Sequence, residues 1–158
     1  MSNGTVRVSV GAADVSRLIY VDVSIWVALL TNEPSSPALK HWLEGETGQL
    51  VTSRWSVVEV SSALSIKVRR AELQLQQAQE LCAHFDALVR GDVSLLPLAS
   101  ADYDHAAVLC RNAASGLRAG DALHLAVARR ARASYLLTLD KVMARNAKKL
   151  GLQLLQNV

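Results

Sequence analysis

The chain has 158 residues, of which 51% are apolar and 20% charged, a composition that fits one globular domain and excludes a disordered chain. No apolar run reaches the ~20 residues that span a bilayer, and the N-terminus lacks the apolar stretch of a signal peptide, so we expect a cytoplasmic protein without a membrane segment. The net charge is only +3, but from Arg118 onward there are eight Lys or Arg and two Asp. This basic third indicates an anionic partner such as nucleic acid, or equally well a solvated helix face.

From residue 18 onward, short β-rich apolar runs alternate with longer segments that have helical spacing of apolar residues. The first half predicts, in order, a strand at 18–22, helices at 24–32 and 35–46, a strand at 49–53, and helices at 54–70 and 73–91. The second half predicts a strand at 93–99, helices at 100–114 and 117–133, a strand at 134–140, a helix at 141–151 and a strand at 152–158. Ser100 is the expected cap of its helix, because acidic residues follow in the first turn.

Strands that alternate with helices indicate an α/β sandwich around a largely parallel sheet. Residues 1–17 precede this pattern, and "VRVSV" within them fits either an additional strand or a loose tail. Cys82 and Cys110 lie in helical segments, where buried free thiols are favoured over a disulfide. No spacing of His and Cys predicts a zinc site.

One charged residue, Asp22, stands in the otherwise mostly apolar stretch "LIYVDVSIWVALL". It ends the first predicted strand, and Asp140 ends the fourth strand in the same way. In open α/β sheets, ligands bind beyond the carboxyl ends of the strands, so both acids fall where a site is expected. Each of them also fits a plain helix N-cap, and for either residue alone neither explanation is favoured.

Two further acids stand where an apolar residue is expected. Glu59 shares a predicted helix face with Trp55, Ala63 and Ile66, at the positions i−4, i+4 and i+7, so it is placed on the face that should be buried. A solvated boundary position is the alternative. Asp121 opens a helix that is apolar nearly all round, where the helix dipole alone is enough to stabilise a carboxylate.

Together the four carboxylates are harder to explain as caps and boundary residues. Placed close to one another, such acids would repel and raise one another's pKa values, and a divalent cation removes that repulsion. Ligation by carboxylates alone suits Mg²⁺ or Mn²⁺ better than zinc. A metal held in this way positions a water and stabilises the charge that develops on a phosphodiester.

The segments "YVDVSIWVALL", "SVVEVSSAL", "LRAGDALHLAVA" and "LLTLDKVMARNAKKLGLQLL" resemble PIN domains, especially VapC-type toxins of bacterial toxin–antitoxin systems. The resemblance covers about residues 18–158 and leaves residues 1–17 as an N-terminal extension. It implies a PIN-like three-layer α/β/α sandwich with a mostly parallel central sheet. The sequence departs from the family pattern in its 17 leading residues and at Gly120, where a larger residue is frequent.

The resemblance also implies the roles of particular residues. Asp22, Glu59, Asp121 and Asp140 match the family's acidic quartet, which is catalytic and holds Mg²⁺ or Mn²⁺. Ser24, Thr138 and Arg118 match supporting positions, and Arg118 either meets a phosphate or lies in solvent. His124 fits a role behind the metal ligands, but we favour a residue that merely packs on its helix face.

The leading hypothesis is therefore a metal-dependent endoribonuclease that cuts single-stranded RNA as the toxin of a toxin–antitoxin pair. By resemblance, the partners are a small antitoxin and a second copy of the chain. The RNA backbone would lie on a basic surface: Arg129, Arg130, Arg132, Lys141, Arg145, Lys148 and Lys149. The alternative is a PIN-like module that binds RNA or protein without cutting. Another type of Mg²⁺ phosphotransfer enzyme ranks lower, because the chain lacks a glycine-rich phosphate loop.

Overall fold

The computed structural model describes residues 14–155 of the chain. Its centre is a five-stranded, all-parallel sheet with the strand order β3-β2-β1-β4-β5. The strands are β1 (Asp14–Val21), β2 (Gly48–Ser53), β3 (Ser94–Leu96), β4 (Tyr135–Leu137) and β5 (Gln153–Leu154). The predicted α/β class and largely parallel sheet are thus confirmed.

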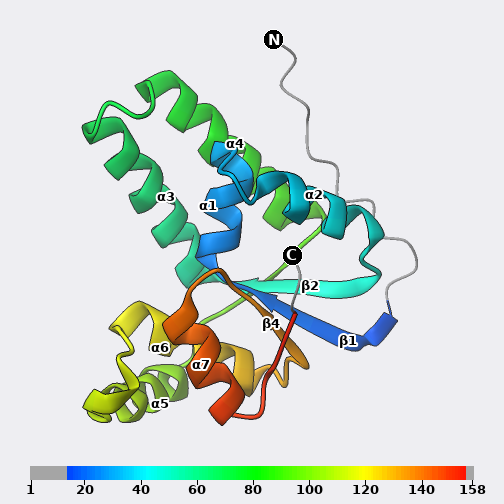
Figure 1. Ribbon diagram of the computed structural model, residues 1–158, viewed down its shortest axis with the longest axis vertical. Helices are drawn as coiled ribbons and strands as arrows, with labels where there is room; N and C mark the ends of the chain where they lie inside the picture. The colour runs from blue at the N-terminus through cyan, green and yellow to red at the C-terminus, as the bar shows by residue number, and fades with distance from the viewer. Residues whose placement is uncertain (1–13, 156–158) are drawn as a thin grey trace.

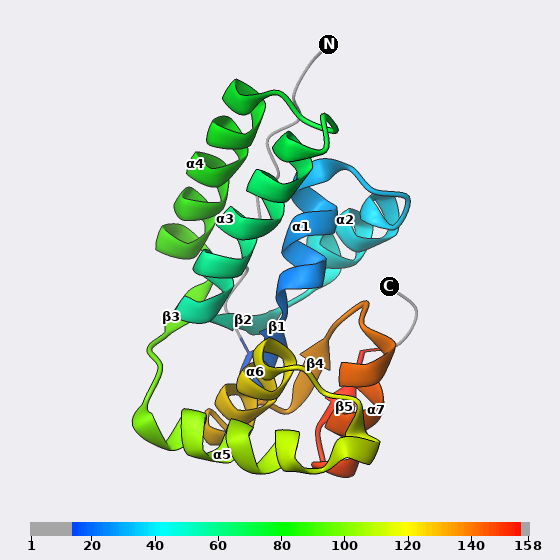
Figure 2. The ribbon, with the colours of Figure 1, turned by 90° about the vertical axis from the view of Figure 1, so that its left-hand side faces the viewer.

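Helices cover both faces of this sheet and give three layers (Figure 1). One face carries α1 (Val23–Thr31), α2 (Ser36–Gly45), α3 (Arg54–Arg69) and α4 (Leu75–Gly91). The other face carries α5 (Ser100–Arg111), α6 (Ala119–Arg130) and α7 (Lys141–Lys149), and a short 3₁₀ turn, η1 (Ala113–Ser115), precedes α6. Figure 2 shows α3 and α4 side by side as a projecting helical pair. Among the residues described, no helix is both long and apolar enough to cross a membrane.

The alternation of side chains along the central strands builds the two cores. Ile19 and Val21 of β1 enter the core beneath α1–α4, whereas Tyr20 between them enters the core on the α6 and α7 side. Leu137 and Leu136 of β4 divide in the same way, in register with Val21 and Tyr20. These strands are apolar on both faces, as a strand covered by helices on both sides requires.

The connections reverse direction at β1. Helices α1 to α4 link β1 to β2 and β3 on one side of the sheet, and the chain then returns through α5 and α6 to place β4 on the other side of β1. Such a switch point leaves a crevice at the carboxyl ends of the two central strands. Asp22 directly follows β1 and Asp140 follows β4 by three residues, so both acids lie at this crevice.

Three predicted details differ in the structure. The first strand begins at Asp14 rather than at residue 18, whereas the "VRVSV" segment lies outside the described residues. Ser100 is not a helix cap: the cap position is Ala99, whose backbone N–H donates to the Asp102 carboxylate at 2.8 Å. The last strand is limited to two residues among those described. The proposed domain boundary at residue 18 stays a prediction.

Candidate functional site

Asp22 is a buried carboxylate held by hydrogen bonds from two parts of the chain. It is the N-cap of α1, and its Oδ1 accepts from the Ser24 backbone N–H at 2.8 Å and from the Ser24 hydroxyl at 2.5 Å. Its Oδ2 accepts from the Thr138 hydroxyl at 2.6 Å. Burial raises the pKa of Asp22, although the hydrogen bonds from Ser24 and Thr138 oppose that rise. Ser24 and Thr138 therefore contact the predicted acid directly.

Asp140 is fixed to the same network through its backbone. Its carboxylate caps α7 by accepting from the Met143 N–H at 2.7 Å, and its own N–H donates to the Thr138 hydroxyl at 2.9 Å. The preceding residue, Leu139, donates its N–H to the Ser24 hydroxyl at 2.9 Å. These bonds connect the turn after β4 to the start of α1. They hold together the ends of β1 and β4, which Asp22 and Asp140 follow.

Asp121 lies in the first turn of α6, where its Oδ2 accepts from the Arg118 backbone N–H at 3.3 Å. Burial raises the pKa of Asp121, and the negative charges of Asp140 and Glu59 raise it further. Asp121 is therefore within electrostatic reach of both Asp140 and Glu59. The Arg118 side chain itself is exposed, so the predicted contribution of this residue to a phosphate contact stays open.

Glu59 is brought to the site, but the expectation that its helix face is buried was wrong. The core face of α3 is formed by Ser56, Val60 and Leu64. Glu59, with a side chain 24% exposed, instead shares with Ser62, Ala63 and Ile66 a face that lines a groove. Ala63 and Ile66, which suggested burial, belong to the wall of this groove, whereas Trp55 packs against a small core cluster of α5 and α6. The spacing of such groove residues is the same as that of a core face.

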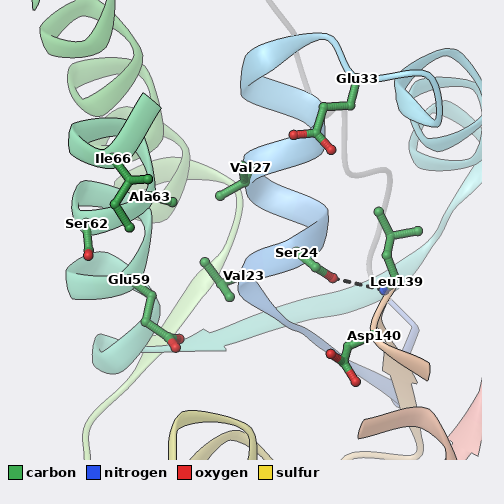
Figure 3. Close-up of a pocket in the computed structure, with 10 residues that line it drawn as sticks. All are labelled: Val23, Ser24, Val27, Glu33, Glu59, Ser62, Ala63, Ile66, Leu139 and Asp140. Carbon is green, nitrogen blue, oxygen red and sulfur yellow. Dashed lines mark hydrogen bonds between the residues drawn. The ribbon is translucent and has the colours of Figure 1, made fainter. Parts of the chain in front are cut away.

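The groove has a volume of about 550 Å³ and runs between α1 and α3. Figure 3 shows Glu59 on one side and Asp140 on the other, with Val23 and Val27 of α1 between them and Glu33 at the far end. Ser24 and Leu139 also line it. Two carboxylates of the predicted quartet therefore open onto an apolar groove that an extended ligand can enter.

His124 makes two side-chain contacts at the site that were not predicted from the sequence. It is fully buried in α6, yet its Nε2 lies 2.5 Å from the Glu59 carboxylate and its Nδ1 lies 2.8 Å from the Tyr20 hydroxyl. It is not a residue that merely packs on its helix face. The sequence signal was its position three residues after Asp121, which places both side chains on one side of α6.

The donors suit a hard divalent cation, but the side chains are not arranged to hold one as they stand. All four predicted residues offer carboxylate oxygens, which Mg²⁺ and Mn²⁺ prefer. Within residues 14–155, no group of three or more His, Cys, Asp or Glu side chains is placed to hold a metal ion. Burial raises the Asp121 pKa most, and the nearby charges of Asp140 and Glu59 add to the rise. A bound cation would relieve this repulsion between the carboxylates. The carboxylate oxygens of these four residues are therefore suitable ligands for Mg²⁺ or Mn²⁺.

The residues of the predicted basic surface differ in their distance from the acids and in whether they are already paired. Arg130 is already paired: its Nε donates to the buried Asp102 carboxylate at 2.7 Å and its guanidinium also donates to the Pro97 carbonyl. Arg129 lies at the same end of α6, eight residues and hence about 12 Å along the helix from Asp121. Arg132 follows this end, and Lys148 and Lys149 end α7.

Two basic residues of this set lie nearer to the acids, at the start of α7. Lys141 is the exposed first residue of α7, directly after Asp140. Arg145 lies one turn further on, and its guanidinium donates to the Ser115 carbonyl at 3.3 Å in the turn that precedes α6. Of the predicted set, these two have the positions best suited to a phosphate beside the acidic cluster.

Several solved structures share this fold. VapC20 from Mycobacterium tuberculosis, a toxin that cleaves the sarcin-ricin loop, has a TM-score of 0.65 at 20% identity, over 81% of this chain and 94% of that chain. VapBC2 from Rickettsia felis, bound to a DNA fragment from its promoter, has a TM-score of 0.63 at 14% identity, over 87% and 97%. FitAcB from Neisseria gonorrhoeae has a TM-score of 0.64 at 15% identity, over 88% and 97%. At these identities the likeness concerns the fold.

No curated protein matches the sequence. The PIN domain profile, in contrast, matches residues 19–149, which include all four predicted carboxylates. The order of the acids, the parallel sheet and the similarity to solved VapC toxins agree with this match. The chain belongs to the PIN domain family.

Proposed function

We propose that the protein is a metal-dependent endoribonuclease that hydrolyses phosphodiester bonds of single-stranded RNA. The observation that carries this proposal is the placement of Asp22 and Asp140 after the adjacent strands β1 and β4, where Thr138 bonds to both. Asp121 lies within electrostatic reach of Asp140 and Glu59. Clustered carboxylates need a cation, and a divalent cation beside an open groove suits attack on a phosphodiester. The fold shared with VapC20, a toxin that cleaves the sarcin-ricin loop, supports a nuclease activity.

Asp22, Asp121, Asp140 and Glu59 would hold Mg²⁺ or Mn²⁺ directly or through waters. When bound, the cation polarises a phosphate oxygen and makes water a stronger nucleophile. Asp22 is too buried to meet the substrate, so its task is to provide charge, with Ser24 and Thr138 keeping its orientation. Glu59 and Asp140 line the groove, so they are the carboxylates that can orient the attacking water or accept its proton.

We also propose that the nuclease is the toxin of a toxin–antitoxin pair and acts in the cytoplasm as a homodimer. The solved structures of VapBC2 and FitAcB, which share the fold, support an antitoxin partner. Its inhibitory segment would need an apolar anchor for the groove and an Arg or Lys that reaches the acids. Growth arrest when the chain is expressed alone, together with copurification of the upstream gene product, supports this; normal growth and no partner favour a housekeeping nuclease.

The cleavage test compares purified wild-type protein with Asp22→Asn on a labelled single-stranded RNA, in Mg²⁺, in Mn²⁺ and in EDTA. Asn keeps the shape of the side chain and removes its charge, so we expect cleavage by wild type in either metal and none in EDTA or with the variant. Asp104→Asn, at an exposed site on α5, is the matched control and should cut normally. Metal-independent cleavage, or full activity of Asp22→Asn, contradicts the mechanism. RNA binding without cleavage in any metal supports a non-cleaving PIN-like module.

A further inference from the structure

Glu59 is the only member of the quartet that is bonded to a buried ionisable side chain among the residues described. The other three acids accept hydrogen bonds only from backbone N–H groups or hydroxyls among the residues described. Glu59 instead reaches from α3 to His124 of α6, 65 positions away in the sequence. Since α3 and α6 lie on opposite faces of the sheet, this contact joins the two helical layers at the site.

His124 joins Glu59 to Tyr20 through its two ring nitrogens. An ionised carboxylate can only accept, so the bond to ionised Glu59 is donated by the Nε2–H group. In the tautomer that carries only this proton, Nδ1 accepts from the Tyr20 hydroxyl. Tyr20 is fully buried, and burial raises the pKa of its hydroxyl, which therefore keeps its proton. The edge of one ring faces the other, with centroids 5.8 Å apart.

Gly120 leaves room for Oε1 of Glu59, the carboxylate oxygen that does not contact His124. A Cβ built at Gly120 would lie 2.7 Å from Glu59 Oε1 and 3.3 Å from the Trp55 indole nitrogen. That indole N–H is buried and has no hydrogen-bond partner within residues 14–155. Glu59 is thus held at Oε2 by His124, while Oε1 lies over the start of α6, one residue from Asp121.

We infer that His124, backed by Tyr20, is a positioning residue that sets the orientation of Glu59 for metal binding. The inference rests on the proposed function. A glutamate has three rotatable side-chain bonds, and without His124 it would point freely into a groove that is open to solvent. Bonding one oxygen removes most of that freedom and leaves the other available. Groups behind a metal ligand that orient it in this way affect affinity although they never touch the metal.

The test measures the affinity of Mn²⁺ for the full chain by isothermal titration calorimetry, without RNA. His124→Leu removes the donor and keeps the bulk, and we expect it to weaken Mn²⁺ binding by about 10–100-fold. His124→Gln places an amide N–H near the position of Nε2, so it should recover part of the lost affinity. Wild-type affinity in His124→Leu overturns the inference.

A double-mutant cycle separates positioning from a purely structural role. If His124 acts through Glu59, then His124→Leu should cost little further Mn²⁺ affinity in a Glu59→Gln background. Equal losses in both backgrounds would mean that His124 acts through the fold, and the inference would fail. RNA cleavage by the same variants should fall in the same order as their Mn²⁺ affinity.

Two milder variants test the inference even where His124→Leu fails to fold. Tyr20→Phe removes only the hydroxyl that orients the imidazole, and Gly120→Ala pushes on Glu59 Oε1 without touching His124. Both should weaken Mn²⁺ binding while circular dichroism stays that of wild type. Wild-type affinity in both variants overturns the inference.

A crystal structure of metal-free Gly120→Ala or His124→Gln reports the position of Glu59 directly. We expect the Glu59 carboxylate to be displaced in Gly120→Ala and to keep its place in His124→Gln. A Glu59 carboxylate that is displaced in His124→Gln, or that stays in place in a crystal of His124→Leu, contradicts the inference. This readout separates the two proposals: a wild-type protein that binds no Mn²⁺ defeats the proposed function, whereas the structures still decide whether His124 positions Glu59.

Discussion

The Thr138 hydroxyl donates a 2.6 Å hydrogen bond to Oδ2 of Asp22, although the two residues are 116 positions apart in the sequence. The same hydroxyl accepts from the backbone N–H of Asp140. One small side chain at the end of β4 therefore connects the acid after β1 with the acid after β4. Because a hydroxyl donates and accepts at once, it joins a carboxylate to a backbone N–H where a methyl group of the same size would join neither.

Thr138→Val should weaken the site with little change of shape. Valine removes the donor to Asp22 and the acceptor for Asp140, and a lost bond to a buried charged group costs about 1–3 kcal/mol of unfolding free energy. We expect RNA cleavage to fall about 10–100-fold, the usual effect of losing a group behind a metal ligand. Urea denaturation and initial cleavage rates measure the two effects. Thr138→Ser keeps the hydroxyl and should retain most activity; equal loss in both variants would show that the hydroxyl is not the cause.

The buried Asp102, which is paired with the exposed Arg130, should make stability depend on pH. Burial alone would raise the pKa of Asp102, but the hydrogen bonds from Arg130 and from the Ala99 backbone, together with the Arg130 charge, hold it below the ordinary value of 3.8. A carboxyl whose pKa is lowered by folding stabilises the protein above its unfolded pKa, and this contribution is lost as the pH falls through the folded pKa.

Asp102→Asn should therefore lower the unfolding free energy by about 1–3 kcal/mol at pH 7, with a difference from wild type that shrinks below about pH 4. Urea denaturation from pH 7 to pH 3 measures it. Asp104→Asn on the exposed side of the same helix should show neither effect. A difference between Asp102→Asn and wild type that stays constant down to pH 3 would mean that the charge of Asp102 is not responsible.

The two parts of the predicted basic surface should contribute unequally to RNA binding. Lys141 is exposed directly beside Asp140, whereas Arg132 follows the far end of α6. If phosphates lie at the acidic cluster, Lys141→Gln should weaken RNA binding and reduce the slope of log K against log salt by about 0.7, the value for one contact to a single strand. Arg132→Gln removes the same charge and should leave the slope unchanged. Fluorescence anisotropy with catalytically inactive Asp22→Asn protein measures both, and equal effects would place the RNA elsewhere.

The acids at the strand ends could be predicted because their signal is local. A lone carboxylate after a buried β-rich run, twice in one chain, is enough to place Asp22 and Asp140 at one edge of a parallel sheet. Asp121 could be predicted because its helix is apolar all round, and the structure buries every residue from Ala122 to Ala128. These inferences need only periodicity and the geometry of parallel sheets.

The contacts of Glu59 could not be predicted in the same way. Its helix face is apolar in sequence because it walls a groove, and a groove wall has the same periodicity as a core face. The bond between His124 and Tyr20 joins residues 104 positions apart, a pairing on which local pattern carries no information. Charge counting likewise could not separate Arg130, which is paired with Asp102, from basic residues that are exposed.

The most direct test of the central claim is the position of Mn²⁺ in crystals of the wild-type protein, located by its anomalous scattering. We expect a peak at the carboxyl ends of β1 and β4, within direct or one-water reach of the carboxylates of Asp22, Glu59, Asp121 and Asp140. We also expect that the peak is absent in Asp22→Asn crystals soaked identically. A peak only at other carboxylates, or an unchanged peak at this place in Asp22→Asn, would contradict the assignment of these four residues to one metal-dependent site.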